Sequence, residues 1–524
     1  MQDHTVNIDR SVTPSVISFS PIFNVATAFI DRHLDEGRGD RIAIRTDREE
    51  VSYQALYENV NRYGNALKAL GLNEGDRILM AVFDEPAFFY TFWGAIKAGF
   101  VPIPVNTILK APEYRFLIEN SECHAVVYSA DLEGQFKEAV TGEMAGLHVL
   151  STGEGGLAGL AADQPAELSP ARTGPETECF WLYSSGSTGA PKGVVHAHKD
   201  MVITSERYGQ GIAGIRPEDT VYCVGKLFFS YGFGGGMTFP LWAGATTVLV
   251  REKTTPELVF SVVDRFRPDV FFGVPTLYGQ MLHAAPMFNP DMSSIRIALS
   301  AGEALPAHVF EKVQENFGFI ILDGIGSSEV LHIFISNRAD DIRPGTSGKP
   351  VAGYEVKIVD ENKEEIEPGE IGTLWVKGES IATRYWNNPE KTARTMLGEW
   401  LNTGDMYYVD SDGYYVNAGR DDDMLKVGGM WCSPIEIEAH LLRHPNVREV
   451  AVVGRKDEDS MIKPEAFVVL KEANDPDEKI AEDMKQFCKK GLAGYKYPRW
   501  FNFVEDLPKT TTGKIQRFRL RGDR

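Results

Sequence analysis

Residues 183–193 form a loop rich in glycine and in hydroxyl-bearing side chains, with the sequence YSSGSTGAPKG. The loop follows an apolar run, CFWLY, that predicts a strand. Glycines let the backbone curl so that successive N–H groups can point into one concavity and bind phosphate, and Lys192 adds a positive charge. This is not a Walker A loop, because Pro191 stands where that motif has the glycine before its lysine. A flexible surface turn is the alternative, but a turn does not need glycines, hydroxyls and a lysine together.

A second glycine-rich segment, DGIGSSE at residues 323–329, follows the apolar run FIILD. Ligands of open α/β sheets usually lie at such exits from parallel strands. Glu329 could hold Mg²⁺, which takes oxygen ligands and bridges phosphates. The alternative is a solvated glutamate in the first turn of a helix, where acidic side chains are favourable.

Two further segments carry groups that suit a nucleotide. Asp405, in the sequence NTGD, could accept both hydroxyls of a ribose, and Arg420, beyond the next hairpin, could add to that grip. Lys514 directly follows a glycine in LPKTTTGKIQR, within a stretch, 509–524, that holds six basic residues and one acid. This local excess of positive charge indicates binding of anionic ligands. Taken alone, each segment would more often be a turn or a solvated basic tail.

The composition narrows the classes of function. The 524 residues include 54 Lys and Arg against 74 Asp and Glu, a net charge of −20, whereas a general nucleic-acid binder needs a positive surface. Five dispersed cysteines with no CxxC pair predict neither a disulfide scaffold nor a cysteine-based zinc site, and fit a reducing cytoplasm. No signal peptide is evident, and the most apolar stretch, 88–105, is too interrupted by Lys97 and prolines to span a bilayer. We expect a cytoplasmic protein, monomeric or homodimeric, that binds neither nucleic acid nor membrane.

The residues around these motifs alternate between helical and strand patterns. Apolar residues at helical spacing over 51–72 precede a strand at 77–83, and similar alternation continues to about residue 300. Such alternation predicts parallel sheets covered by helices. Residues 151–178, rich in Gly, Ala, Pro and Glu, predict a surface connection. From about residue 345 the pattern changes to β-hairpins, of which 406–419, with its turn at 410–413, is the clearest.

A charge run at 420–423 indicates a domain boundary. The segment 433–445 beyond it predicts a helix whose capping box pairs Ser433 with Glu436. Strands are predicted at 449–455 and 465–471. The expected fold class is α/β: a large amino-terminal domain, 1–421, with helix-covered β-sheets plus a β-rich subdomain, and a small carboxy-terminal α+β domain, 422–524.

Together, and in this order, the four motifs closely resemble the acyl- and aryl-CoA ligase superfamily of adenylate-forming enzymes, over nearly the whole chain. The loop at 183–193 and the PKTTTGKIQR segment are the most specific. Further stretches resemble the benzoate-CoA ligase branch: FWLYSSGSTGAPKGVVH, KLFFSYGFGGG, SAGEALP, DGIGSSEVLHIF, DDMLKVGG and GLAGYKYPR. The resemblance implies that a carboxylate is activated with MgATP, that pyrophosphate is released, and that a CoA thioester is then formed. It thereby implies ATP, Mg²⁺ and coenzyme A as cofactors and a small aromatic acid as substrate.

The resemblance also implies roles for single residues. The loop that would cradle the β- and γ-phosphates comprises Ser184, Ser185, Gly186, Ser187, Thr188, Gly189 and Lys192. Thr188 and Glu329 would lie near Mg²⁺. The residues that would border the adenine are Gly302, Glu303, Asp323, Gly324 and Ile325, with Ser328 in the same cofactor site. Asp405 and Arg420 would hold the ribose. Lys514, Lys192 and Glu329 are the expected catalytic residues, with Lys514 reaching between the acid and the α-phosphate.

The family's small domain is mobile, which implies a hinge at Asp422. Rotation would withdraw Lys514 and bring in the segment that begins at Lys426, so that Gly429 lines the pantetheine tunnel. Acylation of Lys514 would neutralise its charge and stop adenylation.

The aryl pocket is expected to be a slot of aromatic and small residues, which suits a benzoate ring by offset stacking. Its candidates are Phe229, Ser230, Tyr231, Phe233, Ala301, Gly326 and His332. Ordinary core is the alternative for each aromatic residue and for His332. Two residues depart from the family pattern. Ile325 stands where a tyrosine often stacks on adenine. Ser230 stands where benzoate ligases tend to have alanine, and its hydroxyl could bond a ring substituent or a water.

The leading interpretation is an ATP-dependent aryl-CoA ligase for benzoate or a small substituted benzoate. Alternatives within the enzyme class are a hydroxybenzoate- or aminobenzoate-CoA ligase and a stand-alone aryl-adenylating enzyme that loads a carrier protein. A non-catalytic nucleotide sensor would have no reason to retain Lys514 and Asp422, and the aryl-specific segments disfavour a luciferase-like oxygenase. The pair His196 and His198 lacks the set of carboxylates and cysteines that a metal site needs, and is expected to be structural or on the surface.

Overall fold

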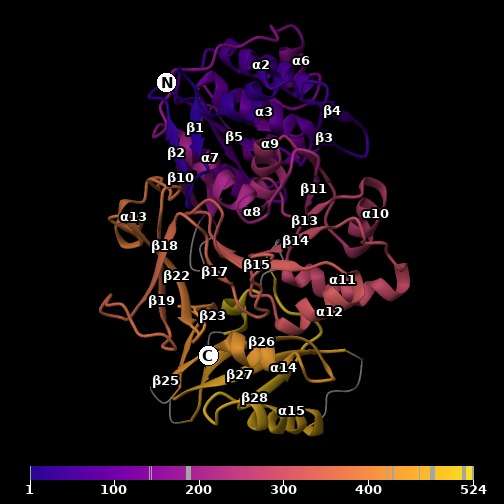
Figure 1. Ribbon diagram of the computed structural model, residues 1–524, viewed down its shortest axis with the longest axis vertical. Helices are drawn as coiled ribbons and strands as arrows, with labels where there is room; N and C mark the ends of the chain where they lie inside the picture. The colour runs from indigo at the N-terminus through magenta and orange to yellow at the C-terminus, as the bar shows by residue number, and fades with distance from the viewer. Residues whose placement is uncertain are drawn as a thin grey trace.

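The computed structural model shows a chain arranged in successive layers (Figure 1). The described residues are 2–140, 142, 144, 146–184, 191–421, 423–427, 430–458, 461–471, 478–509 and 515–521. In Figure 1 the amino-terminal sheets lie at the top, a long central sheet follows, and a small α+β unit lies at the bottom.

The amino-terminal layer is a parallel four-stranded sheet covered by helices. Its strand order is β6-β5-β7-β8, from β5 (Arg77–Ala81), β6 (Val101–Pro104), β7 (Ala125–Tyr128) and β8 (His148–Ser151). Helix α2 (Tyr53–Ala69) begins at Ser52, whose side chain accepts a hydrogen bond from Ala55 N at 3.1 Å. It packs on α3 (Pro86–Ala98) so closely that a Cβ on Gly64 would lie 2.8 Å from the Gly94 carbonyl oxygen. Both glycines therefore serve helix packing.

The central sheet has nine strands in the order β17-β16-β15-β14-β13-β11-β12-β3-β4. The strands from β15 to β3 are parallel, and the outer strands β4, β16 and β17 are antiparallel to their neighbours. The strand bounds are β3 (Ile42–Arg45), β4 (Glu50–Ser52), β11 (Thr220–Cys223), β12 (Thr246–Val248), β13 (Val270–Gly273), β14 (Ile297–Ser300), β15 (Ile321–Gly326), β16 (Ile333–Ser336) and β17 (Lys349–Pro350). One face packs against α10 (Pro256–Phe266), α11 (Pro275–Phe288) and α12 (Ala307–Phe317) in one hydrophobic cluster.

A short antiparallel sheet joins the amino-terminal layer to the later part of the chain. Its order is β20-β10-β9, from β9 (Glu178–Ser184), β10 (Lys192–Ala197) and β20 (Arg384–Tyr385). Strand β20 lies almost 190 residues beyond β10, and Val194 is paired with Tyr385. This pairing brings the segment near residue 385 beside Gly193, whose carbonyl oxygen accepts from Trp386 N at 2.8 Å.

The β-rich part that follows is a five-stranded antiparallel sheet. Its strands are β18 (Tyr354–Val359), β19 (Gly372–Gly378), β21 (Met396–Leu397), β22 (Trp400–Val409) and β23 (Tyr415–Arg420). The predicted hairpin over 406–419 is confirmed: β22 pairs with β23, and Gly413, with φ of +84°, donates its N–H to Asp410 O at 3.0 Å.

The last part of the chain is a small α+β unit with its own hydrophobic cluster, at the bottom of Figure 1. Its elements are β24 (Leu425–Val427), β25 (Met430–Cys432), α14 (Pro434–Leu441), β26 (Val447–Lys456), β27 (Ile462–Leu470), α15 (Glu478–Gly491), β28 (Trp500–Phe503) and α16 (Arg517–Leu520). The predicted helix and both predicted strands are confirmed. Ser433 caps α14 by accepting from Glu436 N at 3.2 Å, but the Glu436 carboxylate binds Lys496 Nζ at 2.6 Å instead of closing a capping box.

The expectation of a plain surface connection at 151–178 was wrong in part. A short helix, α6 (Leu157–Ala162), interrupts it and buries Leu157 and Ala161 against the core that contains α2. The alanines that suggested a loop are small enough to let a helix approach α2. The elements not yet named are β1 (Val6–Asp9), β2 (Val16–Phe19), α1 (Arg32–Asp35), α4 (Ala111–Ser121), α5 (Glu133–Ala139), α7 (His198–Thr204), α8 (Ser230–Phe233), α9 (Phe239–Ala243), α13 (Pro389–Thr395) and several single turns.

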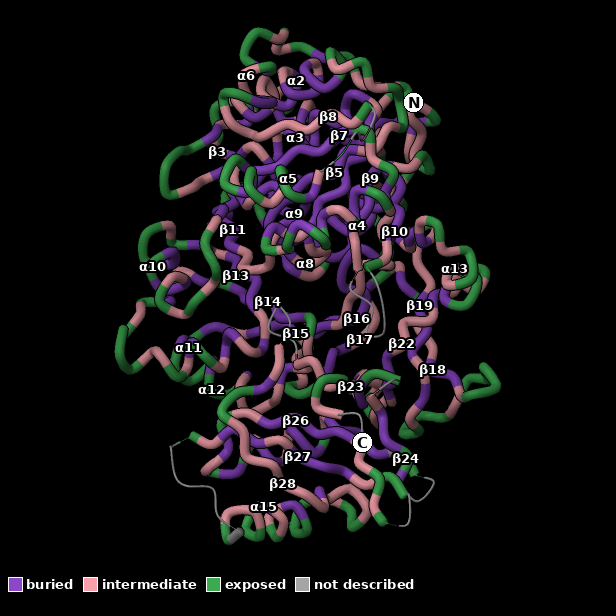
Figure 2. Tube along the Cα trace, turned by 180° about the vertical axis from the view of Figure 1, so that it is seen from behind, coloured by how far each residue is buried: buried purple, intermediate pink, exposed green. Residues whose placement is uncertain are grey.

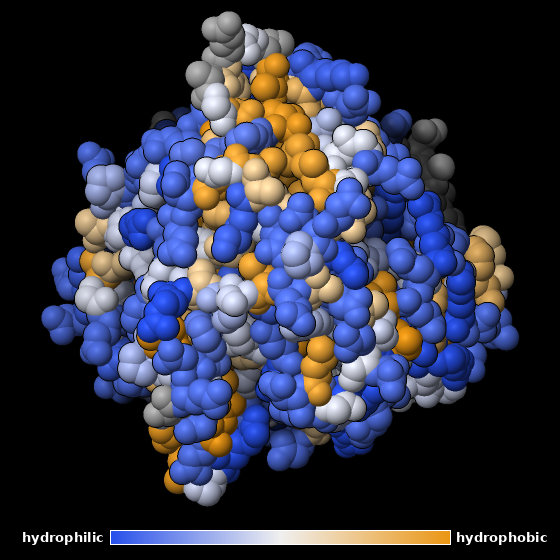
Figure 3. Space-filling model, turned by 90° about the horizontal axis from the view of Figure 1, so that it is seen from above, coloured by the Kyte–Doolittle hydropathy of each residue, from blue (hydrophilic) through white to orange (hydrophobic). Residues whose placement is uncertain are grey.

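Burial follows these layers. In Figure 2 the strands and the central helices are buried, and the exposed residues gather in the loops and on the outer helices. Seen from the amino-terminal end, the surface is mostly hydrophilic, with an apolar strip near the top of the view and smaller apolar patches elsewhere (Figure 3). Among the described helices, none has the length and apolar character needed to cross a membrane.

Candidate active site

A cleft of about 2290 Å³ lies between the central sheet, the β22–β23 hairpin and the small α+β unit. Helices α11 and α12 line it from one side and α14 and α16 from the other. It gathers eight residues that the sequence predicted for the nucleotide and acid sites: Gly302, Glu303, Asp323, Gly324, Ile325, Gly326, Asp405 and Arg420. Segments separated by more than a hundred residues thus meet where the central sheet ends.

Asp405 and Arg420 face each other across the hairpin. They are directly opposite in the register of β22 and β23, and Arg420 Nη1 donates to Asp405 Oδ1 at 2.9 Å. Asp405 is buried, whereas half of the Arg420 side chain is exposed. The arginine therefore holds a carboxylate at the cleft wall in one orientation, as a group that receives two vicinal hydroxyls requires.

Asp323 presents a buried carboxylate to the same cleft. Its side chain is 6% exposed; Oδ2 accepts from Leu305 N at 3.4 Å, and Oδ1 has no hydrogen-bond partner among the described residues. Burial raises the pKa of this carboxyl to about 7. Its own carbonyl oxygen accepts from Asn337 N at 2.9 Å, which fixes the main chain. The unpartnered oxygen is a ready acceptor for an amino group of a ligand.

The strands that flank the predicted phosphate loop are described at both ends. Ser184 ends β9, Lys192 begins β10, and the two are register partners. The loop residues between them fall outside the described part of the chain, namely Ser185, Gly186, Ser187, Thr188 and Gly189. Their assignment to phosphate stays a prediction.

Ser328 and Glu329 lie in the loop that joins β15 to β16 rather than in a helix. The Ser328 carbonyl oxygen accepts from His196 Nε2 at 2.8 Å, and Glu329 Oε1 accepts from Tyr385 Oη at 2.8 Å. His196 belongs to β10 and Tyr385 to β20, so the sheet that carries Lys192 also holds Glu329. The surface location left open for His196 is excluded, because its side chain is fully buried.

The predicted aryl wall is a tight turn of helix. Phe229, Ser230 and Tyr231 are half-buried, and α8 continues without a break into a π-helical turn, Gly234–Thr238. The Phe233 ring is buried, stacked on Phe180 at 5.0 Å between centroids, within the amino-terminal core. Irregular helical turns of this kind are frequent at functional sites.

His332 packs against this turn. Its ring stacks on Tyr231 at 5.7 Å, and burial lowers its pKa to about 3, so the ring is neutral near pH 7. Its Nδ1 has no hydrogen-bond partner in the described part of the chain. A Cβ on Gly234 would lie 2.3 Å from His332 Cδ2, so this glycine permits the contact.

Gly326 also permits a close contact, because a Cβ there would lie 2.6 Å from the His332 carbonyl oxygen. The close pairing of β15 with β16 thus explains why a glycine stands at this position. Ala301 is buried near the end of β14.

Asp422, Gly429 and Lys514 lie outside the described residues. Lys426 is described, and its Nζ lies 2.5 Å from Glu361 Oε1, on the β18–β19 hairpin.

A cluster of ion pairs at the cleft was not predicted from the sequence, and we call it the hub. In it, Arg517 binds Glu438 Oε2 at 2.7 Å and approaches Asp423 Oδ2 at 3.7 Å. In the sequence, Arg517 was visible only as one of the six basic residues of 509–524. This hub ties α16 to α14.

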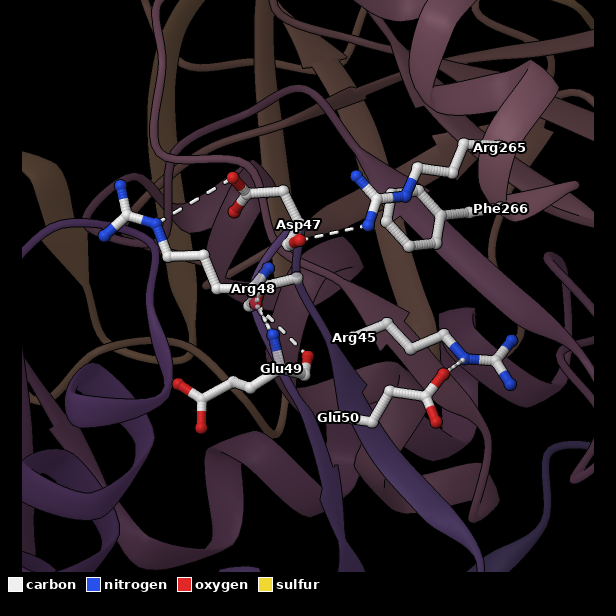
Figure 4. A pocket seen from close by; sticks show the side chains of 8 residues that line it. Arg45, Asp47, Arg48, Glu49, Glu50, Arg265 and Phe266 are labelled. Atoms are coloured by element: carbon white, nitrogen blue, oxygen red, sulfur yellow. Dashed lines mark hydrogen bonds and ion pairs between the residues drawn. The ribbon is translucent and has the colours of Figure 1, made fainter.

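A smaller pocket of about 440 Å³ lies elsewhere, at the β3–β4 hairpin (Figure 4). Two of its arginines bond within the pocket: Arg45 Nε binds Glu50 Oε1 at 2.8 Å, and Arg265 Nη2 donates to Asp47 O at 3.0 Å. The pocket contains none of the residues predicted for the site.

Two family models match the chain: AMP-binding enzyme over residues 31–386, and AMP-binding enzyme C-terminal domain over residues 436–514. The sequence is 49% identical to a benzoate–CoA ligase of Thauera aromatica, over 98% of both chains. The structure of a benzoate CoA ligase from Burkholderia xenovorans LB400 is similar with a TM-score of 0.89 and 43% identity, covering 95% of this chain and 100% of that one. The anthranilate CoA ligase AuaEII in complex with anthranoyl-AMP is similar with a TM-score of 0.92 and 40% identity, covering 96% and 97%.

Proposed function

The chain belongs to the AMP-binding enzyme family, in its benzoate-CoA ligase branch, and we propose that it is an ATP-dependent ligase that joins a small aromatic acid to coenzyme A. The observation that carries this proposal is the cleft in which Asp323, Asp405 and Arg420 converge from three separate segments. In the first half-reaction a carboxylate oxygen of the acid attacks the α-phosphorus of ATP, and pyrophosphate leaves. In the second, the thiol of coenzyme A attacks the acyl carbon, loses its proton, and displaces AMP.

Three groups of site residues bind the three parts of the nucleotide. Asp405, oriented by Arg420, receives the ribose hydroxyls, and the unpartnered oxygen of Asp323 receives the adenine amino group. Lys192, with Ser184 and the loop between them, holds the β- and γ-phosphates. Catalysis then rests on positioned charge, because the transferred group passes through a transition state with charge spread over its oxygens.

The residues present fit a magnesium ion that arrives with ATP. Magnesium is usually bound by one or two carboxylates together with substrate phosphates. Glu329 supplies such a carboxylate, and its Oε2 has no hydrogen-bond partner among the described residues. When bound, the ion would neutralise phosphate charge; Glu329, with Thr188 from the loop, would hold it.

A rotation of the small domain about Asp422 would separate the two half-reactions. Lys514 would act only in the first, and the segment of Lys426 and Gly429 would line the thiol's path in the second. Lys514 is the residue at which acylation would switch adenylation off. We also propose that the two domains meet between residues 421 and 422. The protein is proposed to act in the cytoplasm.

The preferred acid is benzoate or a benzoate with a small substituent. Tyr231 and His332 offer stacked, neutral surfaces for a ring. Ser230 adds a half-buried hydroxyl for which no hydrogen bond exists within the described residues, and a substituent such as hydroxyl or amino could satisfy it. Loading of a carrier protein is the second candidate, since it shares the adenylation half.

The test is a panel of acids with Mg²⁺, ATP and coenzyme A: benzoate, the hydroxybenzoates, the aminobenzoates, cinnamate and acetate. AMP and thioester are followed in parallel. We expect benzoate-type acids to give both products and acetate to give neither. Formation of AMP without thioester would favour loading of a carrier protein. The absence of turnover with every acid would refute the proposed ligase activity.

A further inference from the structure

Glu329 is held by a hydroxyl group that the proposed reaction does not use. Tyr385 Oη donates to Glu329 Oε1 at 2.8 Å, and the tyrosine is only 4% exposed. Its ring packs with Val194 and Ala382 in a small hydrophobic cluster of its own. The hydroxyl is therefore directed by packing toward one carboxylate oxygen, while Oε2 keeps its acceptor capacity.

Hydrogen bonds also fix the backbone that carries this carboxylate. Three successive carbonyl oxygens, of residues 328, 329 and 330, accept hydrogen bonds from residues outside the loop. The donors are His196 Nε2 at 2.8 Å, Ala382 N at 2.8 Å and Ser380 Oγ at 2.9 Å. A loop with three successive carbonyls bonded to residues outside it has little freedom to shift when a ligand binds.

The conformation of Leu331, two residues after Glu329, also indicates that the surrounding structure fixes this loop. It is a buried leucine with φ of +72°, in the left-handed region that leucine avoids. Such a conformation persists only where the surrounding structure imposes it, and it gathers at functional sites.

The donor is a buried hydroxyl group that lies 2.8 Å from the carboxylate oxygen. A hydrogen bond from a neutral hydroxyl to a carboxylate is among the stronger ones, and it orients the acceptor without cancelling its charge.

We propose that Tyr385 is a positioning residue that orients the Glu329 carboxylate so that its second oxygen can receive the cation that accompanies the nucleotide phosphates. This inference rests on the proposed function, because it takes Glu329 as the cation ligand. Partners that orient metal-binding side chains typically change metal affinity by about 10- to 100-fold when they are removed. Strand β20, which carries Tyr385, thereby contributes to the site, although it is distant in sequence from Glu329.

The test uses Tyr385→Phe in the full-length protein, with Tyr53→Phe as the matched control. Tyr53 is also buried and donates its hydroxyl to Ala245 O at 2.7 Å, in the amino-terminal core. Two readouts are taken as functions of free Mg²⁺: the rate of pyrophosphate release, and the rise in melting temperature caused by ATP, relative to each variant's own nucleotide-free value. Thioester formation from supplied benzoyl-AMP, which has no pyrophosphate or cation step, is the third.

We expect Tyr385→Phe to raise the Mg²⁺ concentration at half-effect about 10-fold or more in both titrations, with thioester formation from benzoyl-AMP within twofold of wild type. Tyr53→Phe should change none of the three. In a Glu329→Gln background, adding Tyr385→Phe should alter the Mg²⁺ requirement less than twofold, because the two residues act through one contact. An unchanged Mg²⁺ requirement in Tyr385→Phe, or the same factor in both backgrounds, would overturn the proposal. If the wild-type protein shows no Mg²⁺-dependent pyrophosphate release, it is the proposed function that fails.

Discussion

Replacing Asp323 with asparagine should stabilise the nucleotide-free protein above neutral pH. The Asp323 carboxyl is buried beside the cleft, and its Oδ1 has no partner among the described residues, so ionisation there is unfavourable. Asparagine has nearly the same shape and no charge. Its amide oxygen can still accept a hydrogen bond from an adenine amino group.

The magnitude follows from the pKa. Burial raises the pKa of Asp323 from 3.8 to about 7, and at 1.36 kcal/mol per pKa unit this corresponds to about 4 kcal/mol of unfolding free energy. The raised pKa destabilises the folded protein as the pH rises, because the folded state holds the Asp323 proton at pH values where the unfolded state has released it. The stability of the wild type relative to the variant therefore falls between pH 4 and pH 7 and is level above that range. Between pH 5 and pH 8 the difference should grow by about 2 to 3 kcal/mol in favour of the asparagine variant.

The assay is thermal unfolding of both proteins at pH 5 and pH 8 without nucleotide. Asp291→Asn is the matched control, since Asp291 is exposed and its pKa is lowered to about 2, chiefly by hydrogen bonds from Ser293. Its contribution is already constant above pH 5, so this control should show no change in relative stability between the two pH values. A difference between wild type and Asp323→Asn that stays constant from pH 5 to pH 8 would refute the burial argument.

The other predictions concern the reaction. Arg420→Ala should raise the KM for ATP several-fold, with a much smaller change in kcat, because it releases Asp405 from its fixed orientation; a KM unchanged in steady-state kinetics would contradict that role. Gly234→Ala should lower kcat/KM for benzoate by at least tenfold while the KM for ATP stays within twofold, because the added Cβ would displace the His332 ring; normal kinetics with benzoate would place His332 outside the acid site. Lys514→Ala should abolish adenylation yet spare thioester formation from supplied acyl-AMP, and equal loss in both half-reactions would exclude the two-conformation scheme.

The placement of the candidate residues could be predicted from the sequence where a local pattern sets it. Asp405 and Arg420 stand on either side of a turn that Asp410 and Gly413 specify, so the hairpin places them opposite each other. The glycine-rich exit from β15 likewise follows from an apolar strand that ends at Gly326. In both cases the residues that matter lie within about twenty positions of one another.

What could not be predicted depends on long-range pairing. Tyr385 reaches Glu329 only because β20 pairs with β10, across almost 190 residues. His196 was visible as part of a histidine pair, but nothing near it in the sequence indicates that its ring bonds the loop before Glu329. Helix α6 was missed because an alanine- and glycine-rich segment has a weak pattern, and contact with α2 decides its conformation. Gly326 lines the cleft as expected of a site residue, but the sequence did not show that the backbone of His332 and Ile333 fills the place of a Cβ there.

The most direct test of the central claim is the stoichiometry of a single reaction. Purified protein is incubated with benzoate, Mg²⁺, ATP and coenzyme A, and AMP, pyrophosphate and benzoyl-CoA are quantified together. The account predicts one AMP and one pyrophosphate for each benzoyl-CoA, with no thioester when ATP is omitted. Thioester formed without AMP, or AMP released from ATP without any acyl product from a panel of aromatic acids, would contradict it.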